Sequence, residues 1–180
     1  MAILPITIFG DKILREKTKD FENIDGNTIT LIQDMFETMR NADGIGLAAN
    51  QVGVDKSIFI IDLSPVEGFE KLKPMVFINP KIIERSTELI KMDEGCLSIP
   101  YLKAPVERPE AIKIQFLDTD EKMQELDADG YLARVIQHEF DHLIGKVYTD
   151  RVDPIIKKKL KDDLLRIRRH QIDVDYPIAE

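Results

Sequence analysis

The sequence predicts an α+β fold in which mainly antiparallel β-sheets pack around a central helix, with a further helix at the C-terminus. Apolar residues recur at helical spacing only early, at 28–40, and late, from residue 130 onward, whereas short runs of β-forming residues fill the middle. Three prolines between residues 100 and 109 exclude a helix there. Segregation of strands from helices is typical of α+β proteins and not of alternating β-α-β units.

The first predicted element is an amphipathic helix over residues 28–40, with Asn27 or Thr28 as its N-cap. The turn pair Asp43-Gly44 follows it. Residues 57–63 and 75–79 are short apolar runs rich in β-formers, and we expect strands there, the second ended by Pro80.

Three further stretches of the middle are expected to be extended: 82–92, 111–117 and 123–126. The second alternates apolar and polar residues, as a half-buried strand does, and a turn at 118–121 joins it to the third.

Two helices are predicted late in the chain. The first spans 130–143, with Asp129 as N-cap and Gly145 just beyond its end. The second spans 154–169 and begins with Pro154, a residue that helices favour at their first position. Residues 155–170 carry seven Lys and Arg against two Asp, in a chain whose net charge is −8.

The 180 residues fit a single domain, which we expect to span 1–180. No apolar run approaches the roughly 18 residues that cross a bilayer, and residues 1–10 lack the basic start and cleavage site of a signal peptide. The only cysteine, Cys96, excludes an internal disulfide and favours a reducing compartment. We therefore expect a cytoplasmic protein with no membrane partner.

His138-Glu139-Phe140-Asp141-His142 is an H-E-x-x-H motif within a predicted helix. Its two histidines are four residues apart and so lie on one helix face, where both reach one divalent metal ion. Glu139 stands beside the first ligand, where it can take a proton from a water molecule at the metal. The alternative is a surface helix that carries these residues by chance, but two of the chain's three histidines are here.

A catalytic site needs a third protein ligand. Downstream of His142, Tyr148 occupies the position where one metallopeptidase class has its third ligand, a His. Another class has a downstream Glu as third ligand, but no Glu lies between His142 and the final residue. Asp162 and His170 lie in charged, solvated segments. The stronger candidate is upstream, at Cys96. A lone cysteine is more often a small buried hydrophobe, but a Cys-His-His site suits Fe(II), Zn(II), Co(II) or Ni(II).

The segment 44–51, G-I-G-L-A-A-N-Q, carries small residues that let another chain approach the backbone closely. It lacks the Lys-Ser/Thr ending of a phosphate-binding loop. Taken alone, it is more typical of tight packing against a helix or turn than of a binding site.

Three segments in this order, G-I-G-L-A-A-N-Q at 44–51, E-G-C-L-S at 94–98 and H-E-F-D-H at 138–142, closely resemble peptide deformylases, which remove the formyl group from nascent N-formylmethionyl peptides. The chain length and the basic C-terminal helix also resemble the bacterial type. The family usually has Thr or Pro where this chain has Asn50.

The resemblance implies that Cys96, His138 and His142 hold the metal, with water as a fourth ligand. The family's physiological metal is typically Fe(II), and zinc, nickel or cobalt can substitute for it. Glu139 is implied as general base and then general acid. The resemblance further implies that the Gln51 side chain and the Leu97 backbone N–H stabilise the oxyanion.

The resemblance also implies that Ile45, Gly46 and Gly95 pair with the substrate backbone by strand addition. From the residues themselves, Arg134 lies four positions before His138, on the same helix face. We expect Arg134 to line the pocket mouth, with its stem on the methionine side chain and its guanidinium in solvent. A plain surface arginine is the alternative. Asp141 is expected to orient a neighbouring arginine.

The expected partners are N-formylmethionyl nascent peptides, with no DNA and a monomeric state implied by the family. The basic helix has two interpretations, a solvated face or a dock on ribosomal RNA. Two other functions compete with the deformylase. A metallopeptidase would need its third ligand downstream, and a structural metal site would need four protein ligands, for which the chain offers only one spare histidine, His170.

Overall fold

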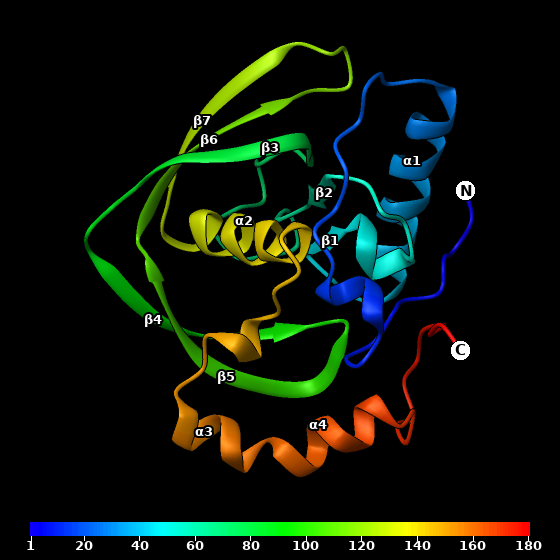
Figure 1. Cartoon of the computed structure of the whole chain (residues 1–180). Coiled ribbons are helices and arrows are strands. Elements are labelled where there is room, and N and C mark those ends of the chain that lie inside the picture. Colours follow the sequence, from blue (N-terminus) through cyan, green and yellow to red (C-terminus); the bar gives the residue numbers. More distant parts are fainter.

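Helix α2 (Gly130–Leu143) runs through the middle of the molecule, and two antiparallel sheets enclose it (Figure 1). The computed structural model describes all residues, 1–180. Ten residues of α2 are buried, so this helix belongs to the core along most of its length. The predicted α+β class, with antiparallel sheets around a central helix, is confirmed.

The larger sheet has five strands in the spatial order β1 (Gly46–Ala48), β2 (Ile58–Ile61), β3 (Met75–Arg85), β6 (Ala111–Leu117) and β7 (Met123–Asp129). The smaller sheet pairs β4 (Leu89–Cys96) with β5 (Ile99–Pro109). Every pairing is antiparallel. β1 and β4 each have a strand on one side only, so both present a free edge.

The prediction that Pro80 ends a strand is wrong, because β3 continues through it to Arg85. Ile78 pairs with Leu117 and Lys81 with Gln115, so Asn79 and Pro80 together face a single residue of β6 in a bulge. Asn79 adopts a φ of 49° there. Proline is tolerated at a bulge because its missing N–H interrupts no ladder hydrogen bond.

Helix α1 (Gly26–Asn41) begins earlier than the sequence predicted. Its N-cap is Asp25 and neither Asn27 nor Thr28. The Asp25 carboxylate accepts a hydrogen bond of 2.9 Å from the Thr28 N–H, and the Thr28 hydroxyl faces the Asp25 N–H in return. Such a reciprocal capping box satisfies two free backbone donors, which a single polar residue within the helix cannot do.

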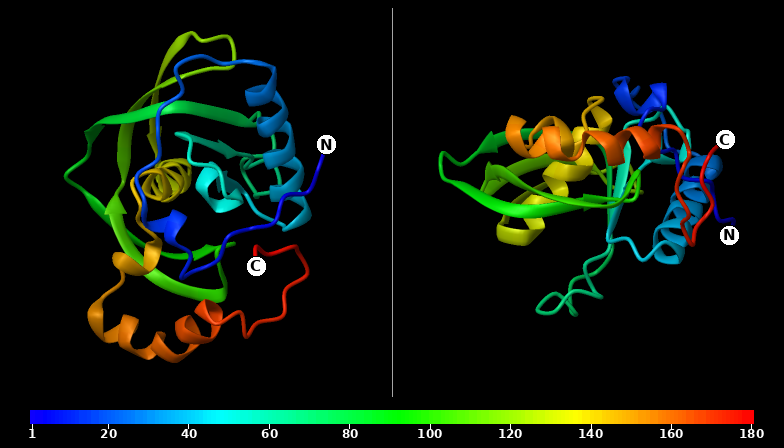
Figure 2. Two further views of the ribbon diagram at one scale, coloured as in Figure 1. Left: turned by 45° about the vertical axis from the view of Figure 1, so that its right-hand side comes forward. Right: turned by 90° about the horizontal axis from the view of Figure 1, so that it is seen from below.

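The predicted C-terminal helix exists, but it is interrupted at Leu160. It consists of α3 (Pro154–Lys159) and α4 (Lys161–Arg168). Leu160, Leu164 and Ile167 pack on one apolar cluster beside β5, and the interruption lets both halves follow that surface. Beyond α4 the chain turns back toward the N-terminus, and both ends lie on the same side of the molecule (Figure 2).

Three short 3-10 turns complete the fold: η1 (Lys12–Arg15), η2 (Ala49–Val52) and η3 (Tyr148–Asp150). Of these, η2 matters for the site, because it directly follows β1 and all four of its residues are buried. None of the helices is both long and apolar enough to cross a membrane.

Candidate active site

The two histidines of the H-E-x-x-H motif lie on one face of α2, as their spacing predicted. His142 is completely buried and His138 nearly so. Their rings are 5.2 Å apart between centroids. The helix ends directly after this pair, with Gly145 at a φ of 74° just beyond the end, as predicted. Asp129 is the N-cap residue, although its side chain makes no capping hydrogen bond.

Cys96 comes to these histidines from the other layer, at the end of β4. Its Sγ lies 3.4 Å from His142 Nε2. One donor atom of each of Cys96, His138 and His142 lies within 4.8 Å of the other two, a separation that allows one ion to contact all three. No other group of three or more His, Cys, Asp or Glu side chains forms such a cluster in the chain.

The chemistry of this cluster fits a metal cation. Burial lowers the pKa of His142 well below its ordinary value, so its imidazole is neutral, the form that binds metals. Burial also lowers the pKa of His138, but hydrogen bonds with Cys96 and Glu94 outweigh it and raise the pKa well above the ordinary value. Negative charge that attracts a proton to His138 also attracts a metal ion. A thiolate with two imidazoles suits a borderline-soft divalent metal.

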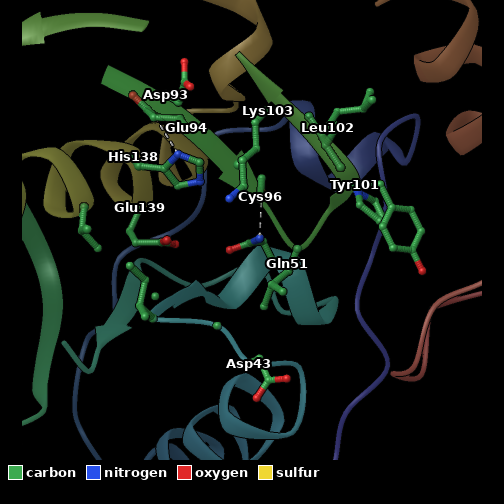
Figure 3. Close-up of a pocket in the computed structure, with 18 of the residues that line it drawn as sticks. Asp43, Gln51, Asp93, Glu94, Cys96, Tyr101, Leu102, Lys103, His138 and Glu139 are labelled. Carbon is green, nitrogen blue, oxygen red and sulfur yellow. Dashed lines mark hydrogen bonds and ion pairs between the residues drawn. The ribbon is translucent and has the colours of Figure 1, made fainter. Parts of the chain in front are cut away.

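Glu139 points into the same space (Figure 3), and Gly46 of β1 lies against its side chain. Burial raises the pKa of Glu139 to about 7, although the nearby His138 opposes the shift. Its Oε2 is buried without a hydrogen-bond partner in the protein. A Cβ on Gly46 would lie 2.5 Å from Glu139 Oε1, so a larger residue at this position would displace the Glu139 side chain. A carboxyl group with a pKa near neutrality suits general acid–base work.

Gln51 approaches Cys96 from η2 (Figure 3). Its Oε1 accepts a hydrogen bond of 2.9 Å from the Ala48 N–H, which fixes the orientation of the amide. The Nε2 group therefore faces the other way and donates to Cys96 Sγ at 3.4 Å and to Ser98 Oγ at 3.1 Å. Leu97 lies in the turn directly after Cys96, and its backbone N–H donates to no protein group.

A cavity of about 610 Å³ connects these groups. Every expected site residue lines it except the buried His142. Ile45 and Gly46 at β1 and Gly95 of β4 all line this cavity, and β1 and β4 are both edge strands. Like Leu97, Ile45 has a backbone N–H without a protein acceptor. The cavity therefore offers unpaired backbone donors beside a metal-binding cluster.

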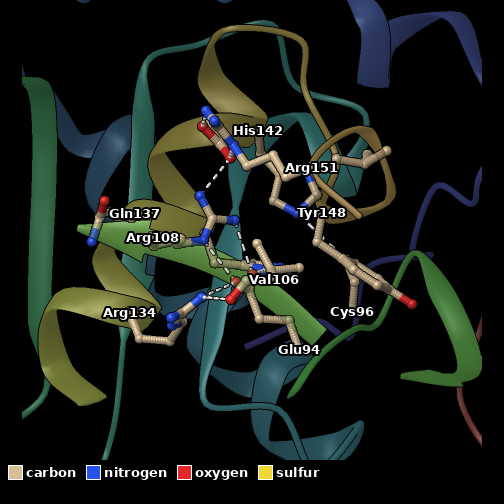
Figure 4. A network of polar contacts seen from close by, with 12 residues as sticks. Glu94, Cys96, Val106, Arg108, Arg134, Gln137, His142, Tyr148 and Arg151 are labelled. Carbon is tan, nitrogen blue, oxygen red and sulfur yellow. Dashed lines mark hydrogen bonds and ion pairs between the residues drawn. The ribbon is translucent and has the colours of Figure 1, made fainter. Parts of the chain in front are cut away.

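A buried network of charged side chains lies next to the cluster of Cys96, His138 and His142 (Figure 4). Glu94 Oε1 lies 2.8 Å from His138 Nδ1. Arg108 donates to both Glu94 oxygens, at 2.7 and 2.9 Å, and to Asp141 at 2.8 Å. Arg151 donates twice to the same Asp141, as expected of an aspartate that orients a neighbouring arginine. Burial opposes the ionisation of Glu94, but the arginine and histidine partners hold its pKa below the ordinary value.

The expectation that the Arg134 guanidinium lies in solvent is wrong. Arg134 is 4% exposed. It donates to Glu94 Oε2 at 2.9 Å, to the Val106 carbonyl at 2.7 Å and to the Ile90 carbonyl at 2.5 Å. Its helix face packs on the β4–β5 sheet, where a buried carboxylate and two carbonyls attract the guanidinium. Arg134 still lines the cavity, but its charged group serves the network behind the histidines.

Three residues near the site were not predicted. Glu94 precedes Cys96 by two positions in β4 and lines the same cavity, and this spacing is visible in the sequence. Arg108 is almost completely buried, and no local pattern distinguishes it from a surface arginine. Tyr176 comes from the last residues of the chain and lines the cavity.

An H-E-x-x-H helix, a cysteine from a neighbouring sheet beside its two histidines and a carboxyl group with a raised pKa together indicate a metal-dependent hydrolase. The model of the polypeptide deformylase family matches residues 3–158. The chain therefore belongs to the polypeptide deformylase family. It is a hydrolase that removes the N-formyl group from newly synthesised polypeptides.

Individual relatives agree over nearly the whole chain. A peptide deformylase of Salinibacter ruber is 43% identical, over 98% of this chain and 94% of its own length. The solved peptide deformylase of Plasmodium falciparum has a TM-score of 0.85 and 35% identity, over 92% of this chain and 95% of that chain. For the Legionella pneumophila structure the TM-score is 0.85 and the identity 35%, over 94% and 98% of the two chains.

Proposed function

We propose that Cys96, His138 and His142 hold one Fe(II) ion and that the surrounding residues carry out deformylation of N-formylmethionyl peptides at it. The observation that carries this proposal is the meeting of their three donor atoms, within 4.8 Å of one another, beside an open cavity. When bound, the ion supplies Lewis acidity for the formyl carbonyl and for water. Zinc, nickel or cobalt can replace iron in such a donor set.

Glu139 is the proposed acid–base. Its carboxylate takes a proton from the attacking water and gives it to the departing amine of methionine. A pKa of about 7 in the metal-free chain suits both transfers near neutral pH. Gly46 leaves this carboxylate room, because any larger residue would fill the space that Glu139 occupies.

The Gln51 amide and the Leu97 N–H are the proposed donors to the oxyanion. Both flank Cys96, and the Ala48 N–H holds Gln51 so that its amide nitrogen faces the site. Donors that are fixed before the reaction stabilise the charge that develops on the formyl oxygen, each by about 2.7–4 kcal/mol.

The peptide is proposed to lie between the free edges of β1 and β4. Ile45 and Gly46 on one side and Gly95 on the other would pair with its backbone. Tyr131 and Val135 of α2 line the same cavity and offer apolar surface for the methionine side chain. Arg134 forms part of that wall while its guanidinium holds Glu94.

Formate release tests the function. Chain loaded with Fe(II) under anaerobic conditions should release formate from a formyl-Met-Ala-Ser peptide and leave the matched acetyl-Met-Ala-Ser peptide intact. Cleavage within an unformylated peptide would point to a metallopeptidase instead, and absence of formate from the loaded protein would contradict the proposal. Metal analysis of protein purified without oxygen tests the choice of iron.

We further propose that the protein acts in the cytoplasm as a monomer and docks on ribosomal RNA through α3 and α4. The cations Lys158, Lys161 and Arg169 are exposed there and make no ion pair in the protein. Reversing these three charges should weaken ribosome binding and leave formate release from a short peptide unchanged. Reversal of the exposed Lys71, Lys73 and Lys122, far from these helices, is the matched control. Equal binding by the two variants would contradict docking.

A further inference from the structure

The C-terminal tail, residues 170–180, is held against the body at both ends (Figure 1). Ile6 exchanges two backbone hydrogen bonds, each 2.9 Å long, with Pro177 and Ala179. At the other end of the tail, the Tyr101 hydroxyl donates to the Asp173 carbonyl. These contacts join the tail both to the N-terminal segment and to the β4–β5 sheet.

Between these two anchors the tail forms part of the cavity wall. Val174 and Tyr176 line the same space as Cys96, His138 and Glu139. Both lie beyond residues 3–158, the part that matches the family model. The active-site wall of this chain is therefore completed by a segment outside the family's matched region.

Tyr176 makes a specific contact within this wall. Its hydroxyl donates to the Leu97 carbonyl at 2.7 Å, across 79 positions of the sequence. No other group donates to that carbonyl. The neighbouring Ser98 is held by other elements, since its carbonyl accepts from the Phe9 N–H at 2.8 Å and its hydroxyl from Gln51 at 3.1 Å. The Tyr176 hydroxyl is thus the one hydrogen-bond donor that holds the Leu97 carbonyl in the turn between β4 and β5.

We propose that Tyr176 is a positioning residue for deformylation, which fixes the Leu97 backbone through the Leu97 carbonyl and so holds the Leu97 N–H toward the reacting formyl group. This role rests on the proposed function of that N–H as an oxyanion donor. A donor is effective when it is oriented before charge develops. Without this hydrogen bond the turn that contains Leu97 is more mobile. The Leu97 N–H is then less firmly oriented toward the formyl oxygen in the transition state.

Tyr176→Phe tests this role, since it removes one hydroxyl and keeps the ring that fills the wall. We expect kcat on formyl-Met-Ala-Ser to fall by roughly 3- to 10-fold, the range that corresponds to one hydrogen bond. KM should stay within about twofold, because the donor acts on the transition state and not on the bound substrate. Asp175→Asn, at the exposed neighbouring position outside the cavity wall, should leave both constants unchanged.

A second measurement reports on the contact without using activity. In protein labelled with carbonyl-13C leucine, the Leu97 resonance should shift in Tyr176→Phe and stay in place in Asp175→Asn. A purely structural role would lower the melting temperature and leave kcat unchanged well below it. An unmoved Leu97 resonance would overturn the proposal, and so would a moved resonance with an unchanged kcat.

The outcomes for the two proposals are distinct. If the wild-type protein releases no formate, the proposed function fails and this role fails with it. If the wild-type protein is active and Tyr176→Phe is equally active, only the positioning role fails. A selective fall of kcat together with a shifted Leu97 resonance supports both.

Discussion

Glu94 and His138 meet across the two layers of the molecule, with Glu94 Oε1 2.8 Å from His138 Nδ1. The partners of Glu94 hold its pKa below the ordinary value despite burial, so it is ionised and the imidazole donates to it. This hydrogen bond fixes the tautomer of His138 with its proton on Nδ1. The lone pair of Nε2 is then free to bind a metal ion. The sheet thus sets the orientation of a proposed metal ligand that the helix carries.

Glu94→Gln should weaken metal binding by about 10- to 100-fold, since an amide orients and polarises the imidazole less well than a carboxylate. Competition between the protein and a chelator of known affinity measures the change. Glu107→Gln is the matched control, an exposed position on the neighbouring strand β5. Equal affinities for the two variants would contradict the role of Glu94.

Glu139→Gln should lower kcat by about 100- to 10,000-fold, because the amide can neither accept nor return the proton. Its shape is almost that of Glu139, so metal content should match that of the wild type. Formate release and metal analysis of the same preparation check both statements. A variant with full metal content and a nearly unchanged kcat would exclude Glu139 as the acid–base.

Gly46→Ala should impair catalysis through Glu139. The added Cβ would lie 2.5 Å from Glu139 Oε1, so the carboxylate has to move. We expect a fall in kcat of at least about 10-fold, since misplacement of a catalytic group by about 1 Å has a large effect on rate. Gly26→Ala is the control, because a Cβ at that exposed position meets nothing within 4 Å. Similar activity of both variants would refute this steric argument.

Asp141→Asn should destabilise the fold by about 1.5–3 kcal/mol at neutral pH, because it weakens one charge-assisted hydrogen bond of the buried Arg108, which keeps its two bonds to Glu94. The partly exposed Arg151 contributes less, owing to solvent screening. Burial raises the pKa of Asp141, but hydrogen bonds from Arg151 and the charge of Arg108 outweigh it and hold the pKa below its ordinary value.

The sign of the pH dependence follows from that lowered pKa. The folded chain binds fewer protons at Asp141 than the unfolded chain does, so the stabilisation is complete above the ordinary pKa of about 3.9 and is lost as the pH falls through the folded value. Urea denaturation from neutral pH down to about pH 3 should therefore show a difference between wild type and Asp141→Asn that is constant until about pH 5 and then shrinks. A difference that stays constant over this range would contradict the prediction.

Local patterns in the sequence were enough to predict several elements. The period of apolar residues located α1 and α2, and the alternation at 111–117 located β6. Prediction failed where a distant partner decided the outcome. Pro80 lies inside β3 because β6 accommodates a bulge opposite it, and no residue beside Pro80 in the sequence indicates this.

The sequence by itself determined that His138 and His142 share a helix face with Glu139 beside them, since four-residue spacing on a helix leaves no alternative. Only the tertiary structure decided which partners the other charged side chains near the site contact. Arg134 shares that helix face, but the β4–β5 sheet places Glu94 against it and buries its guanidinium. Tyr176 reaches Leu97 only because the chain folds back over 79 positions. Spacing along one element is set by backbone geometry, whereas contact between elements depends on the packing of the whole chain.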